Sequence, residues 1–306
     1  MIYLDQLLNE LVQDSTPTDS EMGKALARAE RWGQLLQRDK EMCVEGFLAA
    51  GSCAKGTACR PINDADVMVQ LRPDAFLRAD RQRRQPAAIL EVFAERLSIS
   101  CRSLLGVSVR KQTHSVRLVH EGERSFDVDI VPAYPVGDGI VEIPERGTRE
   151  WVRTSFVRQA ELLDRLDVKN RSVRRSIRLL KLWRDQHDVF LPSYALEVLV
   201  LLAAFRDVPR HPATLLLESL RLLERESKEA LVLGHYWKAS PGLRTGVYDP
   251  AVPGNNLTRH LYADERRKIA SRAARSANAL ESARRYAENG SLSRAEERVG
   301  AAFGLT

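Results

Sequence analysis

The sequence has few cysteines and histidines, and neither type is clustered. Its six histidines are scattered, and no CxxC spacing occurs among its four cysteines, which are Cys43, Cys53, Cys59 and Cys101. Structural zinc sites need close pairs of such ligands. We therefore expect no zinc site in this protein.

The sequence also lacks a long apolar segment. A membrane-spanning helix needs about 20 apolar residues, whereas the longest apolar run here, from Tyr194 to Phe205, has about a dozen and contains Glu197. The N-terminal segment carries Asp5 and Glu10 among its apolar residues, which indicates an amphipathic helix and not a signal peptide. We expect a cytoplasmic protein without a membrane partner.

The excess of positive charge is small. The chain has 306 residues, of which 44% are hydrophobic and 29% charged, an ordinary composition for two globular domains. The formal net charge of +6 fits a protein that handles polyanions. Because this excess is modest, nucleotides suffice as ligands, and a nucleic acid is not required as a partner.

An acidic pair stands out against this background. Asp64 and Asp66 lead into the apolar residues of segment 65–71, which we predict to be a strand. Side chains two positions apart share a face of a strand, so the two carboxylates repel each other. A Mg²⁺ ion that also holds a nucleoside triphosphate is the ordinary reason for such a pair. The alternative is a solvated acidic pair at a strand edge or in a turn.

A second acidic strand follows at 126–132, with the sequence FDVDIVP. Asp127 and Asp129 lie on one face and alternate with apolar residues, and we expect Pro132 to end the strand. If this strand lies beside segment 65–71, a third carboxylate joins the first two. Three carboxylates are the ligand set of a two-metal phosphoryl-transfer site.

The segment before the first acidic pair suits phosphate binding. Residues 44–50 read as a strand, and Gly51 and Ser52 after it permit a tight turn whose backbone N–H groups can approach a phosphate. We expect Gly56 and Thr57 to open a short helix whose N-terminus adds to the anion site.

In this order the motifs resemble the DNA-polymerase-β-type nucleotidyltransferases. Within them the sequence is similar to the cGAS-like and oligoadenylate-synthase-like enzymes, including the bacterial second-messenger synthetases known as CD-NTases, which carry a SMODS domain. The family pattern is a GS turn, an Asp-x-Asp and a third Asp before an apolar-apolar-Pro-Ala run. It matches Gly51 with Ser52, Asp64 with Asp66, and Asp129 before IVPA. The resemblance spans residues 45 to 260, roughly.

The resemblance implies a role for each acid. Asp64, Asp66 and Asp129 would be catalytic and would bind two Mg²⁺ ions, with Mn²⁺ as an alternative metal. Asp127 sits one strand repeat too early for the pattern, and we interpret it as a neighbouring, salt-bridged acid.

Two later segments, LLKLW up to residue 183 and LPSYALE at 191–197, resemble the helix pair that grips the donor nucleotide in this family. The resemblance implies that Lys181 and Ser193 contact its phosphates and that Tyr194 stacks on its base. These roles suit a compact charge, a helix-start hydroxyl and an aromatic ring. From the residues alone, Ser193 is equally a helix N-cap, Tyr194 a core residue and Lys181 a surface lysine.

A basic stripe accompanies Lys181. Arg171, Arg174 and Arg178 lie on the same side of the predicted helix as the lysine. Such a stripe either collects phosphates or pairs with local acids, as solvated faces commonly do.

We predict an α+β, two-lobed nucleotidyltransferase with a small mixed sheet that bears the acids and an all-helical C-terminal lobe. Residues 1–160 would be the catalytic core with the N-terminal helices, and 161–306 the helical nucleotide-gripping domain. Further elements are expected as a helix from near 18–20 to about 40, a helix at 86–98, and strands near 105–110, 114–119 and 125–131.

The predicted activity is metal-dependent joining of nucleoside triphosphates, with ATP expected among them, and release of pyrophosphate. The product would be a cyclic or short linear di- or oligonucleotide second messenger that binds a downstream effector protein in bacterial anti-phage signalling. Two alternatives remain at this stage. One is a template-independent RNA or tRNA nucleotidyltransferase or an AMP-transferring enzyme. The other is a catalytically silent nucleic-acid-binding scaffold. The three converging acids argue against it, because a scaffold without activity does not need them.

Overall fold

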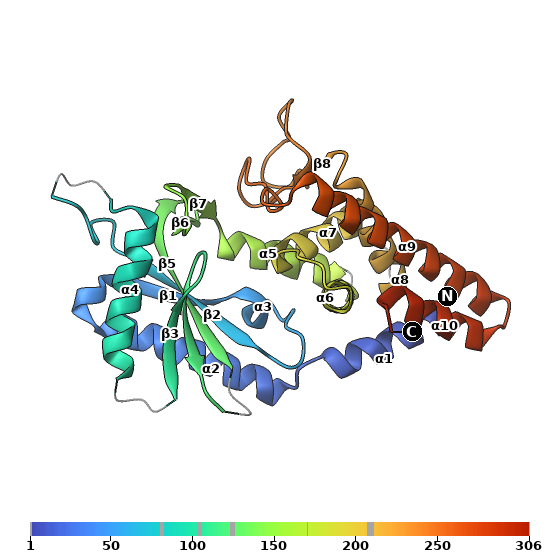
Figure 1. Ribbon diagram of the computed structural model, residues 1–306, viewed down its shortest axis with the longest axis horizontal. Helices are drawn as coiled ribbons and strands as arrows, with labels where there is room; N and C mark the ends of the chain where they lie inside the picture. The colour runs from blue at the N-terminus through green and yellow to red at the C-terminus, as the bar shows by residue number, and fades with distance from the viewer. Residues whose placement is uncertain are drawn as a thin grey trace. The chain divides into compact units, whose positions relative to one another are not determined.

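The computed structural model describes residues 2–79, 83–102, 106–122, 126–169, 171–206 and 211–305. Its internal contacts divide the chain into two units. The sheet unit is Pro17–Arg158, and the helical unit combines Met1–Thr16 with Gln159–Thr306. Figure 1 shows a mixed sheet in the first and a group of helices in the second. The predicted α+β fold class is confirmed.

The sheet unit is built around one mixed sheet with the strand order β1-β2-β5-β4-β3. β2 and β5 run parallel, and the other neighbours pair antiparallel. β6 pairs with the far part of β5, and β7 with β6. The strands are β1 (Val44–Ala50), β2 (Asp64–Leu71), β3 (Val107–Lys111), β4 (Val116–His120), β5 (Asp127–Gly137), β6 (Ile140–Pro144) and β7 (Trp151–Thr154).

The two faces of this sheet are covered differently. Ala65 and Val67 of β2 are fully buried in a core shared with α2 (Asp19–Arg38) and α4 (Pro86–Cys101). Side chains alternate along a strand, so the acids of β2 lie on the face away from these two helices. The sheet therefore presents its carboxylates on the face opposite to α2 and α4.

Several predicted elements are confirmed. The strands at 44–50 and 65–71 and the helix at 86–98 are present as β1, β2 and α4. α2 begins where predicted because Thr18 and Glu21 form a capping box. The Thr18 backbone N–H donates to Glu21 Oε2 at 2.8 Å, and Glu21 N–H donates to Thr18 Oγ1 at 3.2 Å.

The prediction that Pro132 ends its strand is wrong. β5 continues to Gly137, although Pro132 cannot donate a ladder hydrogen bond. The pairing of β5 with β4 stops at Ile130, and its pairing with β6 starts at Tyr134. Pro132 thus lies in the short stretch that pairs with β2 alone, where a proline is tolerated.

The helical unit packs its helices around a leucine-rich core. Its elements are α1 (Ile2–Ser15), α5 (Phe156–Lys169), α6 (Val173–Gln186), α7 (Ser193–Arg206), α8 (Pro212–Arg225), β8 (Ala230–Leu231), β9 (Gly246–Val247), α9 (Ala263–Glu288) and α10 (Leu292–Phe303). Among the residues that the structure describes, no helix has the length and apolar character to cross a membrane.

The prediction placed the first helix with the sheet, in a domain of residues 1–160, and the structure differs at this point. α1 groups with the helical unit, not with the sheet. Leu4, Leu8 and Val12 form its apolar stripe and are buried in the helical core. Residues four apart share a helix face, and this face packs mainly against α6 and α8 of the helical unit. The sequence shows that α1 is amphipathic, but not which core receives it.

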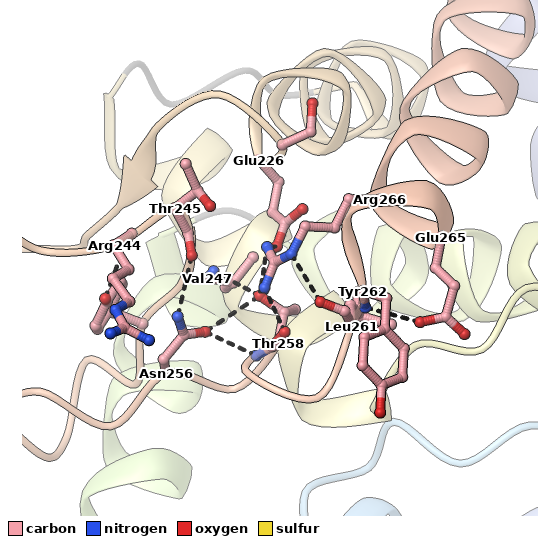
Figure 2. Close-up of polar contacts among 12 residues, drawn as sticks. Glu226, Arg244, Thr245, Val247, Asn256, Thr258, Leu261, Tyr262, Glu265 and Arg266 are labelled. Atoms are coloured by element: carbon pink, nitrogen blue, oxygen red, sulfur yellow. Dashed lines mark hydrogen bonds and ion pairs between the residues drawn. The ribbon is translucent and has the colours of Figure 1, made fainter.

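A buried ionic network ties the loop before α9 to α8 (Figure 2). The guanidinium of Arg266 pairs with Glu226 just after α8 and donates to the backbone carbonyls of Thr258 and Leu261. Thr258 Oγ1 donates to the same Glu226 carboxylate at 2.5 Å. The buried Glu226 carboxylate thus accepts hydrogen bonds from both Arg266 and Thr258.

Asn256 organises the same loop, as Figure 2 shows. Its Nδ2 donates to the Thr245 carbonyl at 3.1 Å, and its Oδ1 accepts from Thr258 N–H at 3.0 Å. Gly246 has a φ of +143°, and a Cβ there would lie 2.5 Å from the Asn256 amide. The turn-rich segment around Asn256 therefore has a structural role.

Candidate active site

The parallel pairing of β2 and β5 brings the acids together. Asp64 is the register partner of Asp127, and Asp66 that of Asp129. Register partners in a sheet point to the same face, so four carboxylates form a two-by-two array on the face that α2 and α4 leave open. The predicted adjacency of the two acidic strands is confirmed.

A cation that the sequence analysis did not identify lies among these acids. Arg117 on β4 is the register partner of Asp129. Its Nε donates to Asp129 Oδ1 at 2.9 Å, and its Nη2 donates to Asp129 Oδ2 at 2.6 Å and to Asp64 Oδ2 at 2.8 Å. Two parallel hydrogen bonds from one guanidinium to one carboxylate make a strong, oriented pair.

Asp127 has a different environment from Asp129. Its Oδ1 accepts a hydrogen bond from the His120 backbone N–H at 3.2 Å, and its Oδ2 is 3.8 Å from Arg117 Nη1. This carboxylate is held by the neighbouring strand and by a longer ionic contact. The arrangement agrees with its interpretation as a salt-bridged neighbour.

The electrostatics of the array favour a cation. Burial, and then repulsion from Asp64 and Asp129, raises the pKa of Asp66 to about 7, although Lys55 and Arg117 act in the opposite direction. Burial, followed by Asp129, also raises the pKa of Asp64, against the lowering effect of Arg117. Two cations, Arg117 and Lys55, thus act on an array of four carboxylates.

Gly51 is required by the position of Asp66. Its φ is +66°, and a Cβ on this residue would lie 1.7 Å from Asp66 Oδ2. A side chain here would displace the carboxylate as well as strain the backbone. Gly51 begins a single helical turn, α3 (Gly51–Ala54), that also contains Ser52. The predicted turn thus contacts the acidic array directly.

The expectation that Gly56 and Thr57 open a helix is wrong. The helical turn lies earlier, at α3, and Thr57 N–H donates back to the Ser52 carbonyl at 2.8 Å. The turn also brings Lys55 close enough to lower the pKa of Asp66. The side chain of Lys55 is buried. In the sequence, the position of Lys55 three residues after the Gly51–Ser52 pair could have identified it as a neighbour of the acids.

The donor set of the array fits a hard divalent cation. Carboxylate oxygens are the ligands that Mg²⁺ and Mn²⁺ prefer, and Arg117 already stands among them as an organic cation. Across the described part of the chain, no three His, Cys, Asp or Glu side chains stand together in ready-made metal-ligand geometry. The Arg117 guanidinium hydrogen-bonds both Asp64 and Asp129, with its Nη2 at 2.8 and 2.6 Å.

The predicted nucleotide-gripping residues lie in the helical unit, on α6 and α7. Lys181 is 4% exposed, and its Nζ donates to Glu197 Oε1 at 3.1 Å. The alternative of a surface lysine is therefore wrong. A buried ion pair fixes the position of the ammonium group.

Ser193 and Tyr194 open α7. Ser193 is exposed, and its Oγ accepts a hydrogen bond from Arg184 Nη1 at 2.8 Å. The Tyr194 hydroxyl donates to the buried Asp249 at 2.8 Å. Burial, and then Asp249, raises the pKa of Tyr194, so its hydroxyl stays protonated. These contacts fix the tyrosine ring.

The basic stripe of α6 is partly neutralised within the helical unit. Arg174 pairs with Asp164 and Asp167 of α5. Local acid pairing, one of the two readings of the stripe, is thus correct for this arginine.

Comparisons with known proteins agree with this geometry. A family model described as the Second Messenger Oligonucleotide or Dinucleotide Synthetase domain matches residues 1–164, more than half of the chain. The cyclic AMP-AMP-AMP synthase of Escherichia coli (strain MS 115-1) is 26% identical over 236 residues, which cover 72% of this chain and 70% of that protein.

Solved structures share the fold at lower identity. CdnC of E. coli MS115-1, determined with ATP, superposes with a TM-score of 0.77 at 21% identity and covers 97% of this chain and 98% of its own. CdnG of Bradyrhizobium diazoefficiens, determined with GTP, gives a TM-score of 0.71 at 18% identity and 98% coverage of both chains.

Enzymes of this family generally depend on a divalent metal and use nucleoside triphosphates. The array on β2 and β5 and the family match support the same conclusion. The chain belongs to the Second Messenger Oligonucleotide or Dinucleotide Synthetase domain family and is a nucleotidyltransferase that joins nucleotides into an oligonucleotide second messenger.

Proposed function

We propose that this enzyme joins ATP molecules into a cyclic oligoadenylate, with Asp64, Asp66 and Asp129 as the ligands of two Mg²⁺ ions. The observation that carries the assignment is the register of β2 and β5, which lines up Asp66 with Asp129 next to Asp64 on one open face. Mn²⁺, which accepts the same oxygen ligands, would substitute for Mg²⁺.

The metal ions, when bound, would neutralise charge on the triphosphate and make the acceptor hydroxyl easier to ionise. The chain's own groups do the rest. Asp129 orients the ribose hydroxyl of the acceptor nucleotide and takes its proton at a carboxylate oxygen. The deprotonated ribose oxygen then attacks the α-phosphorus of the donor nucleotide in line. The bond from that phosphorus to the leaving pyrophosphate breaks, and pyrophosphate is released.

The turn at Gly51 and Ser52 supplies donors for the triphosphate. Its backbone is against the Asp66 carboxylate, as the 1.7 Å distance for a hypothetical Gly51 Cβ indicates. N–H groups of such a turn approach phosphate oxygens without side-chain obstruction. The Ser52 hydroxyl adds a further donor.

The helical unit would bind the donor nucleotide through three residues. Lys181, held by Glu197, offers charge to a phosphate, and Ser193 at the exposed start of α7 offers a hydroxyl and a backbone N–H. Tyr194, held by Asp249, offers a ring face to the base. In this proposal the sheet unit is catalytic and the helical unit binds nucleotide.

The choice of ATP and of a cyclic product rests on the similarity to the cyclic AMP-AMP-AMP synthase and to CdnC determined with ATP. A small cyclic product diffuses, so we propose a downstream effector protein that binds it, in anti-phage signalling. The cytoplasm, where nucleoside triphosphates are made, is the proposed compartment.

Incubation with each labelled nucleoside triphosphate and Mg²⁺, with product separation before and after phosphatase, tests this function. We expect label from ATP in phosphatase-resistant spots, and none for Asp64→Asn or Asp129→Asn proteins that remain folded. Label that appears only in added tRNA, or wild-type product from Asp129→Asn, would contradict the proposal.

A further inference from the structure

The acidic array of the proposed active site contains its own cation. Arg117 and Asp129 are register partners on adjacent strands, so their side chains leave the sheet on the same face. The Arg117 side chain is 26% exposed and that of Asp129 11%. The arginine therefore starts on the strand beside the array, and its guanidinium reaches in among the acids.

One guanidinium reaches carboxylates on two strands. It binds both oxygens of Asp129, at 2.9 and 2.6 Å, and with the same Nη2 it binds Asp64 Oδ2 at 2.8 Å. The planar fork of an arginine matches a carboxylate in this way, whereas a lysine ammonium is a single point of charge. Asp129 is thus held in one orientation, and Asp64 is tethered to it.

The two contacts differ in what they leave open. An ionised carboxylate has about four acceptor positions, so Asp129 can keep the fork and still face a metal with its remaining lone pairs. The contact to Asp64 instead links the two acids, which would together hold a divalent metal. A cation that binds both Asp64 and Asp129 has to displace this single hydrogen bond.

From this geometry we infer that Arg117 is a positioning residue and internal counter-ion of the catalytic triad. It orients Asp129 through the fork, and its charge balances Asp64 and Asp129 while these carboxylates hold no metal. The inference rests on the proposed metal-binding role of these aspartates.

The neighbouring strand offers a matched control. Arg110 on β3 is the register partner of Arg117, so it lies in the same cross-strand row, and it is exposed. Arg110→Gln removes the same charge one strand further from the acids. A general charge effect would appear in both variants, whereas a specific role would appear in Arg117 variants alone.

The test measures Mn²⁺ binding to the full-length protein by electron paramagnetic resonance of the free ion, and thermal unfolding in EDTA and in Mg²⁺. Without its charge, Arg117→Gln is expected to bind Mn²⁺ about tenfold more tightly than wild type, because a cation within about 4–6 Å no longer repels the metal. Its melting temperature in EDTA falls below that of Arg110→Gln, and Mg²⁺ restores it.

Turnover and a second variant separate charge from orientation. The kcat of Arg117→Gln falls at least about tenfold despite tighter metal binding, because Asp129 is no longer held. Arg117→Lys keeps the charge, so Mn²⁺ affinity stays near that of wild type, but kcat remains low without the fork. Arg117→Lys also tests the role of Arg117 if the Arg117→Gln protein does not fold.

The outcomes distinguish this inference from the proposed function. Mn²⁺ affinity and melting temperature equal in Arg117→Gln and Arg110→Gln would overturn the role of Arg117, as would wild-type kcat in Arg117→Lys. Mn²⁺ binding that is unchanged in Asp64→Asn would instead overturn the assignment of the metal ligands.

Discussion

Two buried ionic clusters, one in each unit, differ in their balance of charge. In the helical unit, Glu226 faces one arginine, Arg266, and a threonine hydroxyl, so one acid has one cation (Figure 2). In the sheet unit, four aspartates share Arg117 and Lys55. Matched pairs maintain structure, whereas an excess of one sign is kept where an external ion has to bind.

The largest difference should appear in catalysis. Asp129→Asn is expected to lower the rate of product formation at least about a thousandfold, because a metal ligand and proton acceptor is lost. Pyrophosphate release measures the rate, and circular dichroism checks folding. Asp127→Asn, on the same strand and face, is the control and should retain most activity. Equal losses in the two variants would contradict the distinction between them.

Removing an acid from the balanced cluster should affect stability instead. Glu226→Ala leaves the buried Arg266 without its carboxylate, which costs about 3–5 kcal/mol of unfolding free energy. Denaturant unfolding measures it. Glu281→Ala, which removes the partly exposed partner of Arg221, should cost less than about 1 kcal/mol. A small effect at Glu226 would show that its cluster is not a structural pair.

Gly51 tests how tightly the turn is fitted to the unbalanced cluster. Gly51→Ala places a Cβ 1.7 Å from Asp66 Oδ2, so the carboxylate must move. A displacement of about 1 Å in an active site lowers rates by about a hundredfold. Gly290→Ala has similar backbone strain, at a φ of +75°, but no atom within 4 Å of the added Cβ. If both variants lose the same activity, strain and not the clash is responsible.

The smallest expected effect is a gain of stability on removing a charge. Asp66 has a pKa of about 7 in the folded protein, above the usual value near 4. Between these values the folded state binds more protons than the unfolded state, so metal-free stability falls as pH rises from about 4 to 7.

Asp66→Asn removes this slope. The variant should be more stable than wild type at pH 8 in EDTA, because a buried, repelled charge is absent, and this gain should shrink as the pH falls toward 4. Thermal unfolding across pH measures the difference. Asp74→Asn, on an exposed loop, should change nothing. A slope that persists in Asp66→Asn would assign it to another group.

Local patterns predicted much of this molecule. The alternation at 64–71 and 126–131 identified both acidic strands and their shared face, and the Thr18–Glu21 capping box marked the start of α2. These features depend on residues a few positions apart. The predicted end at Pro132 failed because tolerance of a proline depends on which neighbours a strand still pairs with at that point.

The remaining features depend on contacts between distant segments. α1 is amphipathic by sequence, yet only the packed structure shows its leucines in the helical core. From the sequence, Lys181 could be a phosphate contact or a surface residue. Its buried ion pair with Glu197 depends on the packing of α6 against α7, which the sequence does not show.

The sequence by itself determined that Asp64, Asp66 and Asp129 lie on polar strand faces after a glycine turn, because strand periodicity is a local property. Only the tertiary structure decided that β4 lies beside β5 and brings Arg117 into the array. Strand order depends on pairing and packing among segments far apart in the chain, as in the core that the sheet shares with α2 and α4. The acidic residues of the site can therefore be found from local sequence, whereas their counter-ion, Arg117, can be found only from the folded structure.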